Sequence, residues 1–198
     1  MPTRVYLMRH GEVANDGQKR YNGHIDIDIT EKGLDQMRRL AGLLEGEKIS
    51  AVYSSDLIRS TRGAAIISDR VGIPYTPLRE LRERSVGAWE GLTAEEIKAR
   101  FPSQYAAWRA DALNYRPPGG ECLVDVSARI LPVFKRLVAS HREQEIAMLL
   151  HGGVNRVILA DALGMDPLNI FRLDQAFGAL NIIDCYDDGM AIVRLLNG

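Results

Sequence analysis

The sequence has little cysteine, almost no net charge and no long apolar run, and each of these absences argues against a class of protein. Its 198 residues include two cysteines, Cys122 and Cys185, which are too few for a disulfide framework and lack zinc-ligand spacing. Lys and Arg total 25 and Asp and Glu total 26, which gives a formal net charge of −1. This balance disfavours a general nucleic-acid or anionic-membrane partner, because both need a basic excess.

Membrane and export signals are missing as well. No uninterrupted apolar stretch approaches the roughly 18 residues of a membrane span, and the N-terminal segment is too short for the apolar core of a signal peptide. We therefore expect a reduced, cytoplasmic protein with no membrane and no nucleic-acid partner. The length predicts a single domain over 1–198, because domains commonly contain about 100–200 residues.

Short apolar runs alternate with amphipathic helical segments, which is the pattern of an α/β domain. We expect Asp56 to cap the second helix, Gly63 to mark a tight packing contact and Pro132 to kink the longest helix. A hairpin turn at 187–189 predicts that one sheet edge is antiparallel. The expected strands cover 4–8, 51–54, 146–150, 179–186 and 190–196, and the expected helices cover 31–44, 56–71, 122–141 and 154–163.

The stretch 93–120 departs from this alternation. Thr93 and Glu96 form a capping box for a short helix that should end near Pro102, and a second short helix follows before prolines and glycines break the chain at 116–120. We interpret this stretch as a helical excursion over one end of the sheet. The expected fold is a three-layer α/β/α sandwich with a mostly parallel sheet, an antiparallel edge hairpin and a small helical cap.

Two segments share the order strand, histidine, glycine. Arg9-His10-Gly11 follows the first strand, and His151-Gly152-Gly153 follows the strand at 146–150. Carboxyl ends of parallel strands meet at one rim, where ligands bind. Arg59 belongs to the same rim, in the first turn of a helix whose N-terminus favours anions. Two histidines and two arginines at one rim indicate a phosphate site.

Two other interpretations of these histidines stay open at this point. A histidine at a strand end is often purely structural, and paired histidines can bind zinc. Zinc, however, usually needs three or four close ligands, and the sequence has no His-x-x-x-His or Cys-x-x-Cys spacing. His24 and His141 are expected at the surface.

Further short segments accompany these two in a fixed order along the chain, at 21–26, 29–33, 54–59, 81–83, 87–91 and 118–121. Together with 7–12 and 151–153 they resemble the histidine phosphatase superfamily, also called the phosphoglycerate mutase-like family, over nearly the whole chain. An isolated Arg-His-Gly would be weak evidence, whereas the complete ordered set is specific.

The resemblance implies catalytic roles. His10 would take the phosphoryl group, while Glu83 would protonate the leaving oxygen and then activate water. Composition alone does not choose Glu83 among the neighbouring glutamates; the family motif does. The resemblance also implies that no metal and no cofactor take part, and that 84–121 forms a cap insertion over the active site. The residues expected to hold the phosphoryl group are Arg9, His10, Arg59 and His151, with Asn22, Gly23 and Gly152, and with Asn15 as a weaker candidate.

Several positions depart from the family pattern without removing a catalytic group. Asn155 stands where an apolar residue is usual, and Leu150 stands where a small polar residue is common. Gly63 replaces a threonine or alanine. These departures bear on substrate preference and local packing rather than on the chemistry.

The segment after Glu83 lacks the His-Tyr-Gly of the mutases, and the chain is short, which favours hydrolysis. Segments 89–93 and 117–121 look most like those of α-ribazole phosphatases and related broad-specificity phosphatases. We predict metal-independent hydrolysis of a small phosphorylated metabolite through a phosphohistidine, with α-ribazole 5'-phosphate as a candidate substrate. The alternatives are a cofactor-dependent phosphoglycerate mutase and a non-catalytic phospho-ligand binding module, and a homodimer is left open. In the cap, Tyr105, Trp108 and Tyr115 would either stack on a substrate ring or pack in a local core.

Overall fold

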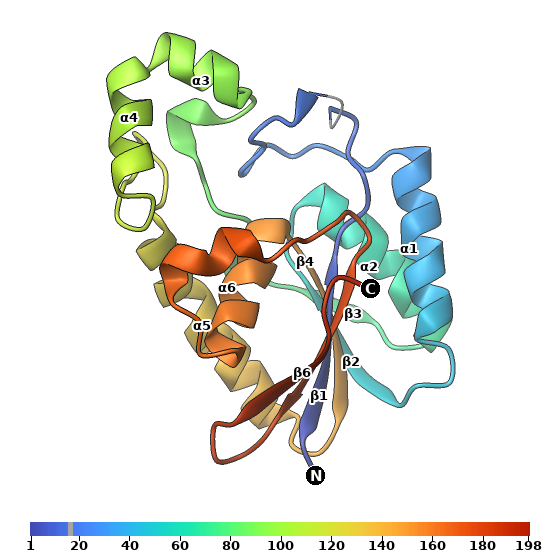
Figure 1. Ribbon diagram of the computed structural model, residues 1–198. Coiled ribbons are helices and arrows are strands. Elements are labelled where there is room, and N and C mark those ends of the chain that lie inside the picture. Colours follow the sequence, from blue (N-terminus) through green and yellow to red (C-terminus); the bar gives the residue numbers. More distant parts are fainter. Residues whose placement is uncertain (16–17) are drawn as a thin grey trace.

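A computed structural model describes residues 1–15 and 18–198 (Figure 1). Its centre is a six-stranded sheet with the strand order β3-β2-β4-β1-β5-β6. Strands β1 to β4 pair in parallel, whereas β5 runs antiparallel to β1 and β6 antiparallel to β5. The strands are β1 Thr3–Arg9, β2 Ile49–Ser54, β3 Tyr75–Pro77, β4 Glu145–Leu150, β5 Leu180–Cys185 and β6 Ala191–Leu195. The mostly parallel sheet with an antiparallel edge is thus confirmed.

Helices cover both faces of the sheet (Figure 1). In β1, Val5 and Leu7 pack into the core cluster that contains α5 Leu123–Ser140 and α6 Gly152–Ala162. Tyr6 and Met8 pack into the opposite cluster, with α1 Glu31–Leu43 and α2 Ile58–Val71. Successive side chains of a strand point to opposite faces, so one apolar run supplies both cores. These three layers confirm the α/β/α expectation.

The cap segment, residues 84–121, contains two short helices, α3 Ala94–Arg100 and α4 Pro102–Ala110. The capping box at the start of α3 is present, because Thr93 and Glu96 accept each other's backbone N–H groups. In Figure 1 these green helices lie beyond the end of the sheet, above the helical layer that contains α5. The described part of the chain also contains the 3₁₀ turns η2 Arg79–Leu81, η3 Gly87–Trp89 and η4 Pro167–Arg172.

Local expectations had mixed outcomes. Gly63 is a tight contact as predicted, since a Cβ there would lie 2.4 Å from the Leu149 side chain. Asp56 does not cap α2, which begins at Ile58; the Asp26 carboxylate accepts the Ile58 N–H at 2.6 Å instead. The Asp56 carboxylate accepts two hydrogen bonds from Arg82, at 2.6 and 2.7 Å, and a fixed ion pair outcompetes a helix cap. α5 continues through Pro132 as one helix.

Some element boundaries differ from those predicted. The helix expected from 154 begins at Gly152, directly after the second histidine. Strand β3 was not predicted, because three edge residues, one half-buried and two exposed, carry no periodic signal. Cys122 and Cys185 are free and buried, as expected. Within the described residues, no helix has the length and apolar character that crossing a bilayer requires.

Candidate phosphate site

The two predicted histidines lie side by side at the carboxyl ends of neighbouring strands. β1 and β4 are paired in register with Arg9 opposite Leu150, so His10 and His151 leave the sheet together. Their ring centroids are 5.2 Å apart. Both side chains are buried, His10 at 5% and His151 at 0% exposure. The parallel pairing of β1 and β4 therefore brings the two histidines together, as the two strand-histidine-glycine segments predicted.

His10 is held as a neutral imidazole whose Nε2 has no hydrogen-bond partner among the described residues. Its Nδ1 lies 2.8 Å from the carbonyl oxygen of Gly11, and a carbonyl can only accept, so Nδ1 carries the proton. Burial, followed by the charges of Arg9 and Arg59, lowers the pKa of His10 well below its ordinary value of 6.5. The Nε2 lone pair is consequently available to an electrophile.

His151 is anchored from the side of β2. Its Nε2 lies 2.7 Å from the Ser55 hydroxyl oxygen, and that oxygen also accepts the N–H of Leu57. Among the described residues the His151 Nδ1 has no hydrogen-bond partner. If the Ser55 hydroxyl donates to Nε2, then Nδ1 holds the ring proton and can donate to an anion. Burial and the charge of Arg59 also lower the pKa of His151 well below 6.5.

Arg59 is a cation fixed inside the protein. It is 2% exposed, and its Nη1 and Nη2 each donate a 2.7 Å hydrogen bond, to the carbonyls of Ile25 and Gly23 respectively. Gly23 has a φ of +47°, and a Cβ there would meet the Glu90 carboxylate at 2.5 Å. Gly23 thus shapes the loop that orients Arg59.

Arg9 is clamped by the segment that precedes β5. Its Nη1 donates to the Gln175 carbonyl, and the Phe177 ring lies 3.7 Å from the guanidinium carbon. The same segment reaches His10, whose carbonyl accepts the N–H of Gly178 at 3.1 Å. A cation over an aromatic face is attracted to it, so the clamp restricts the plane of the guanidinium.

A buried amide network holds this segment in place. Gln175 Oε1 accepts from Asn155 at 3.2 Å and from Asn181 at 2.8 Å, while Gln175 Nε2 donates to the Asn181 side-chain oxygen. All three side chains are at most 1% exposed. Asn181 also donates to the carbonyl of Leu7 in β1. Asn155, one of the departures from the family pattern, therefore serves to lock Gln175.

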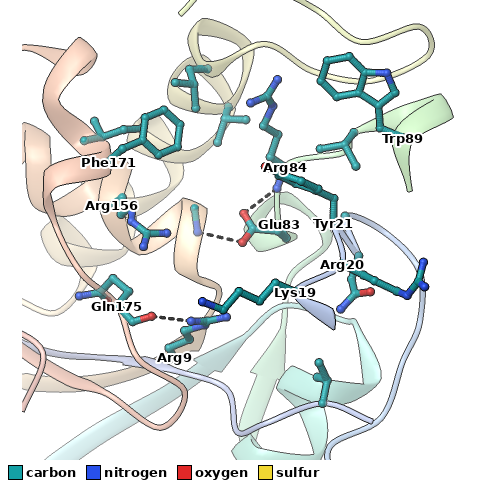
Figure 2. Close-up of a pocket in the computed structure, with 18 of the residues that line it drawn as sticks. Arg9, Lys19, Arg20, Tyr21, Glu83, Arg84, Trp89, Arg156, Phe171 and Gln175 are labelled. Atoms are coloured by element: carbon teal, nitrogen blue, oxygen red, sulfur yellow. Dashed lines mark hydrogen bonds between the residues drawn. The ribbon is translucent and has the colours of Figure 1, made fainter. Parts of the chain in front are cut away.

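Glu83 lies at the N-terminus of α6. Its two carboxylate oxygens accept the N–H of Gly153 at 2.9 Å and of Arg84 at 2.8 Å (Figure 2). A helix N-terminus attracts a carboxylate through its free N–H groups. His24, which was expected to be a surface residue, is half-buried, with its Nε2 2.8 Å from the Glu83 carbonyl. It was placed at the surface wrongly, because nothing in its local sequence reveals a contact across 59 residues.

Ion pairs fix the loop that carries Glu83. Arg82 is tied to Asp56, and the carboxylate of Glu121 accepts from Arg129 at 2.8 Å and from the N–H of Ser85 at 2.9 Å. Glu121 closes the Pro-Gly-Gly-Glu motif noted in the sequence. The motif thus acts indirectly, because Glu121 holds the backbone of the loop that carries Glu83.

One cavity of about 940 Å³ joins most of these groups. Of the predicted residues, Arg9, His10, Asn22, Gly23, Arg59 and Glu83 line it. Among the described residues, His151 and Gly152 do not line it, whereas Gly153 does. Asn22 exchanges hydrogen bonds with Asn15, at 2.7 and 3.0 Å.

The cap aromatics divide between the two roles foreseen for them. Trp108 lines the cavity, whereas Tyr105 and Tyr115 do not. Tyr115 stacks on Trp89 with ring centroids 5.6 Å apart, and Tyr105 packs against Trp108. Tyr105 and Tyr115 thus form the local core of the cap segment, and Trp108 faces the cavity.

A scan of family models matches residues 5–198 to the histidine phosphatase superfamily (branch 1). The chain belongs to this superfamily. A glucosyl-3-phosphoglycerate phosphatase of Mycolicibacterium vanbaalenii is 33% identical over 82% of the chain and 75% of its own length. The adenosylcobalamin/alpha-ribazole phosphatase of Salmonella typhimurium is 31% identical over 98% of the chain and 96% of its own length.

Solved structures agree with this assignment to the histidine phosphatases. A mycobacterial glucosyl-3-phosphoglycerate phosphatase in complex with VO₃ has a TM-score of 0.88 at 29% identity and covers 99% of both chains. A putative alpha-ribazole-5'-P phosphatase of Escherichia coli has a TM-score of 0.89 at 29% identity, over 100% of this chain and 97% of its own. The protein is a phosphatase of this superfamily, and it acts on phosphate esters.

Some residues of the phosphatase site carried no sequence signal. Ser55, Gln175 and Phe177 contact His151, Arg9 and His10 from parts of the chain that are far away in sequence. Ser55 lay within a matching segment, yet its partner was not apparent. Gln175 and Phe177 lie in a stretch without periodicity, and only the fold brings them to the rim.

Proposed function

We propose that the protein hydrolyses a small phosphomonoester without a metal ion, through a phosphohistidine at His10. The observation that carries this proposal is the state of His10: a buried neutral ring, with Nδ1 committed to Gly11 and Nε2 free, on the wall of a cavity that Arg9 and Arg59 also line. An imidazole attacks phosphorus only through an unprotonated nitrogen. The flanking cations keep it unprotonated and attract the phosphate.

The first step transfers the phosphoryl group to the protein. Nε2 of His10 forms a bond to phosphorus while the bond from phosphorus to the ester oxygen breaks, and protonated Glu83 gives its proton to that oxygen. The guanidinium groups of Arg9 and Arg59 stabilise the charge on the equatorial oxygens. In the second step water attacks phosphorus and the P–N bond breaks. The Glu83 carboxylate takes the water proton, and inorganic phosphate leaves.

His151 supports both steps from beside His10, with the two ring centroids 5.2 Å apart. Its Nδ1, which has no partner among the described residues, would donate to a phosphoryl oxygen. The Ser55 hydroxyl fixes the ring through Nε2. A neutral donor suits this position, because a second imidazolium beside Arg9 and Arg59 would be strongly disfavoured.

For the organic part of the substrate we propose two candidates. α-Ribazole 5'-phosphate is supported by the 31% identity to the Salmonella typhimurium phosphatase and by its coverage of nearly the whole chain. Glucosyl-3-phosphoglycerate is supported by the 33% identity to the Mycolicibacterium vanbaalenii phosphatase. A cavity of about 940 Å³ far exceeds a phosphate ion and lies near the upper end of the usual range for small-molecule sites, about 300–1,000 Å³.

The test compares wild type with His10→Ala on a generic aryl phosphate in the presence of a chelator. We expect wild type to release phosphate and the variant to lose at least roughly 10³-fold in kcat/KM, since removing a nucleophile leaves only binding and charge stabilisation. His141→Ala, a histidine on the far end of the sheet that bonds to Tyr53, is the matched control. Full activity in His10→Ala, or none in chelator, would overturn the proposal.

Two alternatives give different results in the same assay. A phosphoglycerate mutase would interconvert phosphoglycerates when primed with 2,3-bisphosphoglycerate and would release little phosphate. A binding module would retain phosphate esters without turnover. Phosphate release without interconversion removes both.

A further inference from the structure

The cavity carries more positive charge than a phosphoryl group needs. A phosphate monoester has a charge of about −1.5 to −2 near neutral pH, which Arg9 and Arg59 already match. Glu83 and Asp174 are the acidic side chains that the structure places in the described wall. The further basic side chains in that wall are Lys19, Arg20, Arg84, Arg109 and Arg156.

Arg156 adds a cation next to the phosphate site. A Cβ on Gly152 would lie 3.3 Å from Nε of Arg9 and 3.4 Å from Nη1 of Arg156, so the two guanidinium groups flank the first residue of α6. Arg156 donates its Nε to the carbonyl of Leu173 at 2.7 Å. Because a carbonyl carries no net charge, this hydrogen bond does not neutralise the positive charge of Arg156. In Figure 2, Arg156 lies to the left of Glu83, and Arg9 and Lys19 lie below it.

Arg84 adds a cation on the opposite side of Glu83 (Figure 2). Its Nε donates to the Glu121 carbonyl at 2.7 Å, and its Nη2 has no acceptor among the described residues. The carboxylate of Glu121 is turned toward Arg129 and Ser85 instead. Burial lowers the pKa of Arg84, because its charge lies in a weakly solvated place.

Arg109 approaches from the cap segment. It is an exposed residue of α4 that lines the cavity beside Trp108. The described residues include no carboxylate within ion-pair distance of Arg84, Arg109 or Arg156, whereas Arg20 is neutralised by Glu96 at 2.9 Å. Like charges that line a cleft with low-dielectric walls focus their field on what enters it.

We propose that Arg84, Arg109 and Arg156 form a subsite for a second anionic group of the substrate, a carboxylate or a second phosphate. This inference rests on the proposed function, because it assumes that Arg9, His10 and Arg59 take the reacting phosphoryl group. It predicts a substrate class: phosphomonoesters whose organic part is itself an anion. Of the two candidates above, this class includes glucosyl-3-phosphoglycerate, through its carboxylate, and not α-ribazole 5'-phosphate, whose organic part is neutral. A neutral organic part would leave these guanidinium groups on the cavity wall without a counter-charge.

The experiment measures binding with two compounds that differ in one group. sn-Glycerol 3-phosphate and 3-phosphoglycerate share a three-carbon phosphate ester, and the second replaces a hydroxymethyl group by a carboxylate. Dissociation constants are measured by calorimetry on His10→Ala, which removes turnover. We expect 3-phosphoglycerate to bind at least about tenfold more tightly, the equivalent of one charge-assisted contact of ~1.4 kcal/mol. Glycerol 1,3-bisphosphate, as a third ligand, distinguishes a preference for phosphate from one for carboxylate.

The ratio of the dissociation constants of sn-glycerol 3-phosphate and 3-phosphoglycerate is then measured on two double variants. These combine His10→Ala with Arg84→Gln or with Arg109→Gln. Each is expected to reduce the preference by at least about threefold, and Arg109→Gln guards against misfolding because its side chain is exposed. Arg100→Gln, an exposed arginine of α3 outside the cavity wall, is the matched control and should keep the ratio. Equal affinities for the first two ligands, or a ratio unchanged in both variants, would overturn the subsite. The proposed function fails separately, by activity persisting in His10→Ala.

Discussion

The rim at the ends of β1 and β4 and the cap segment above it are built in different ways. At the rim, His10, Arg59 and His151 are at most 5% exposed, and the backbone or buried side chains fix each of them. In the cap segment, helix α4 has no buried residue at all, and its side chains reach the cavity from the surface. The rim therefore has the rigidity that phosphoryl chemistry needs, and the cap segment can vary the organic group that is accepted.

The largest effect should come from loosening the rim. Arg59→Lys keeps the charge but loses the planar fork that spans the carbonyls of Gly23 and Ile25, so the charge cannot stay aimed at the phosphoryl oxygens. We expect kcat/KM on an aryl phosphate to fall about 10²–10³-fold. Arg62→Lys, an exposed residue of α2 that pairs with Asp28, is the control and should change little. Similar losses in both variants would refute a special role for Arg59.

Gln175 tests whether the rim depends on its support. Gln175→Leu keeps the volume but leaves the buried side-chain amide of Asn155 without its partner and removes the hydrogen bonds between Gln175 and Asn181. We expect the free energy of unfolding to fall by about 1–3 kcal/mol. We also expect kcat to fall about tenfold through a misplaced Arg9. Denaturant melts and steady-state kinetics measure the two effects, and a stability loss with unchanged kcat would limit Gln175 to a structural role.

How much of this architecture could be foreseen differs between the two regions. Arg9, His10 and His151 follow apolar strands directly, so parallel pairing alone predicts their meeting. Glu83 needed the family resemblance, because several glutamates are equivalent by composition. The clamp of Gln175 and Phe177 on Arg9 escaped prediction, since it joins residues separated by 166 positions in the sequence. Asp56 was misassigned for the same reason: its partner Arg82 comes from a distant loop.

The pH dependence of the free energy of unfolding tests the two buried histidines of the rim. Folding holds the pKa of His10 and of His151 well below 6.5, so below that pH the unfolded chain binds more protons than the native protein. Stability from these groups is therefore present above about pH 6.5 and is lost as pH falls below it. We expect the midpoint of urea unfolding to fall between pH 7 and pH 5 by less in His10→Ala than in wild type. Parallel curves would contradict a buried neutral His10.

The smallest effect is expected in the cap segment. Trp108→Ala removes an aromatic wall of the cavity without touching the rim. We expect KM for a bulky substrate to rise about three- to tenfold, with kcat for phosphate release within about twofold of wild type. Tyr105→Phe, a neighbour that packs against Trp108 outside the cavity wall, is the control. A large loss of kcat in Trp108→Ala would show that the cap segment is not separable from the chemistry.

The central claim is that His10 carries the phosphoryl group, and trapping the intermediate tests it most directly. Wild type is mixed with a ³²P-labelled phosphomonoester, quenched in alkali within the first turnovers, and digested for mass spectrometry. The account predicts a label on the peptide that contains His10, stable in alkali and lost in acid, and absent from His10→Ala. Hydrolysis without any acid-labile label in wild type, or a label on another residue, would contradict it.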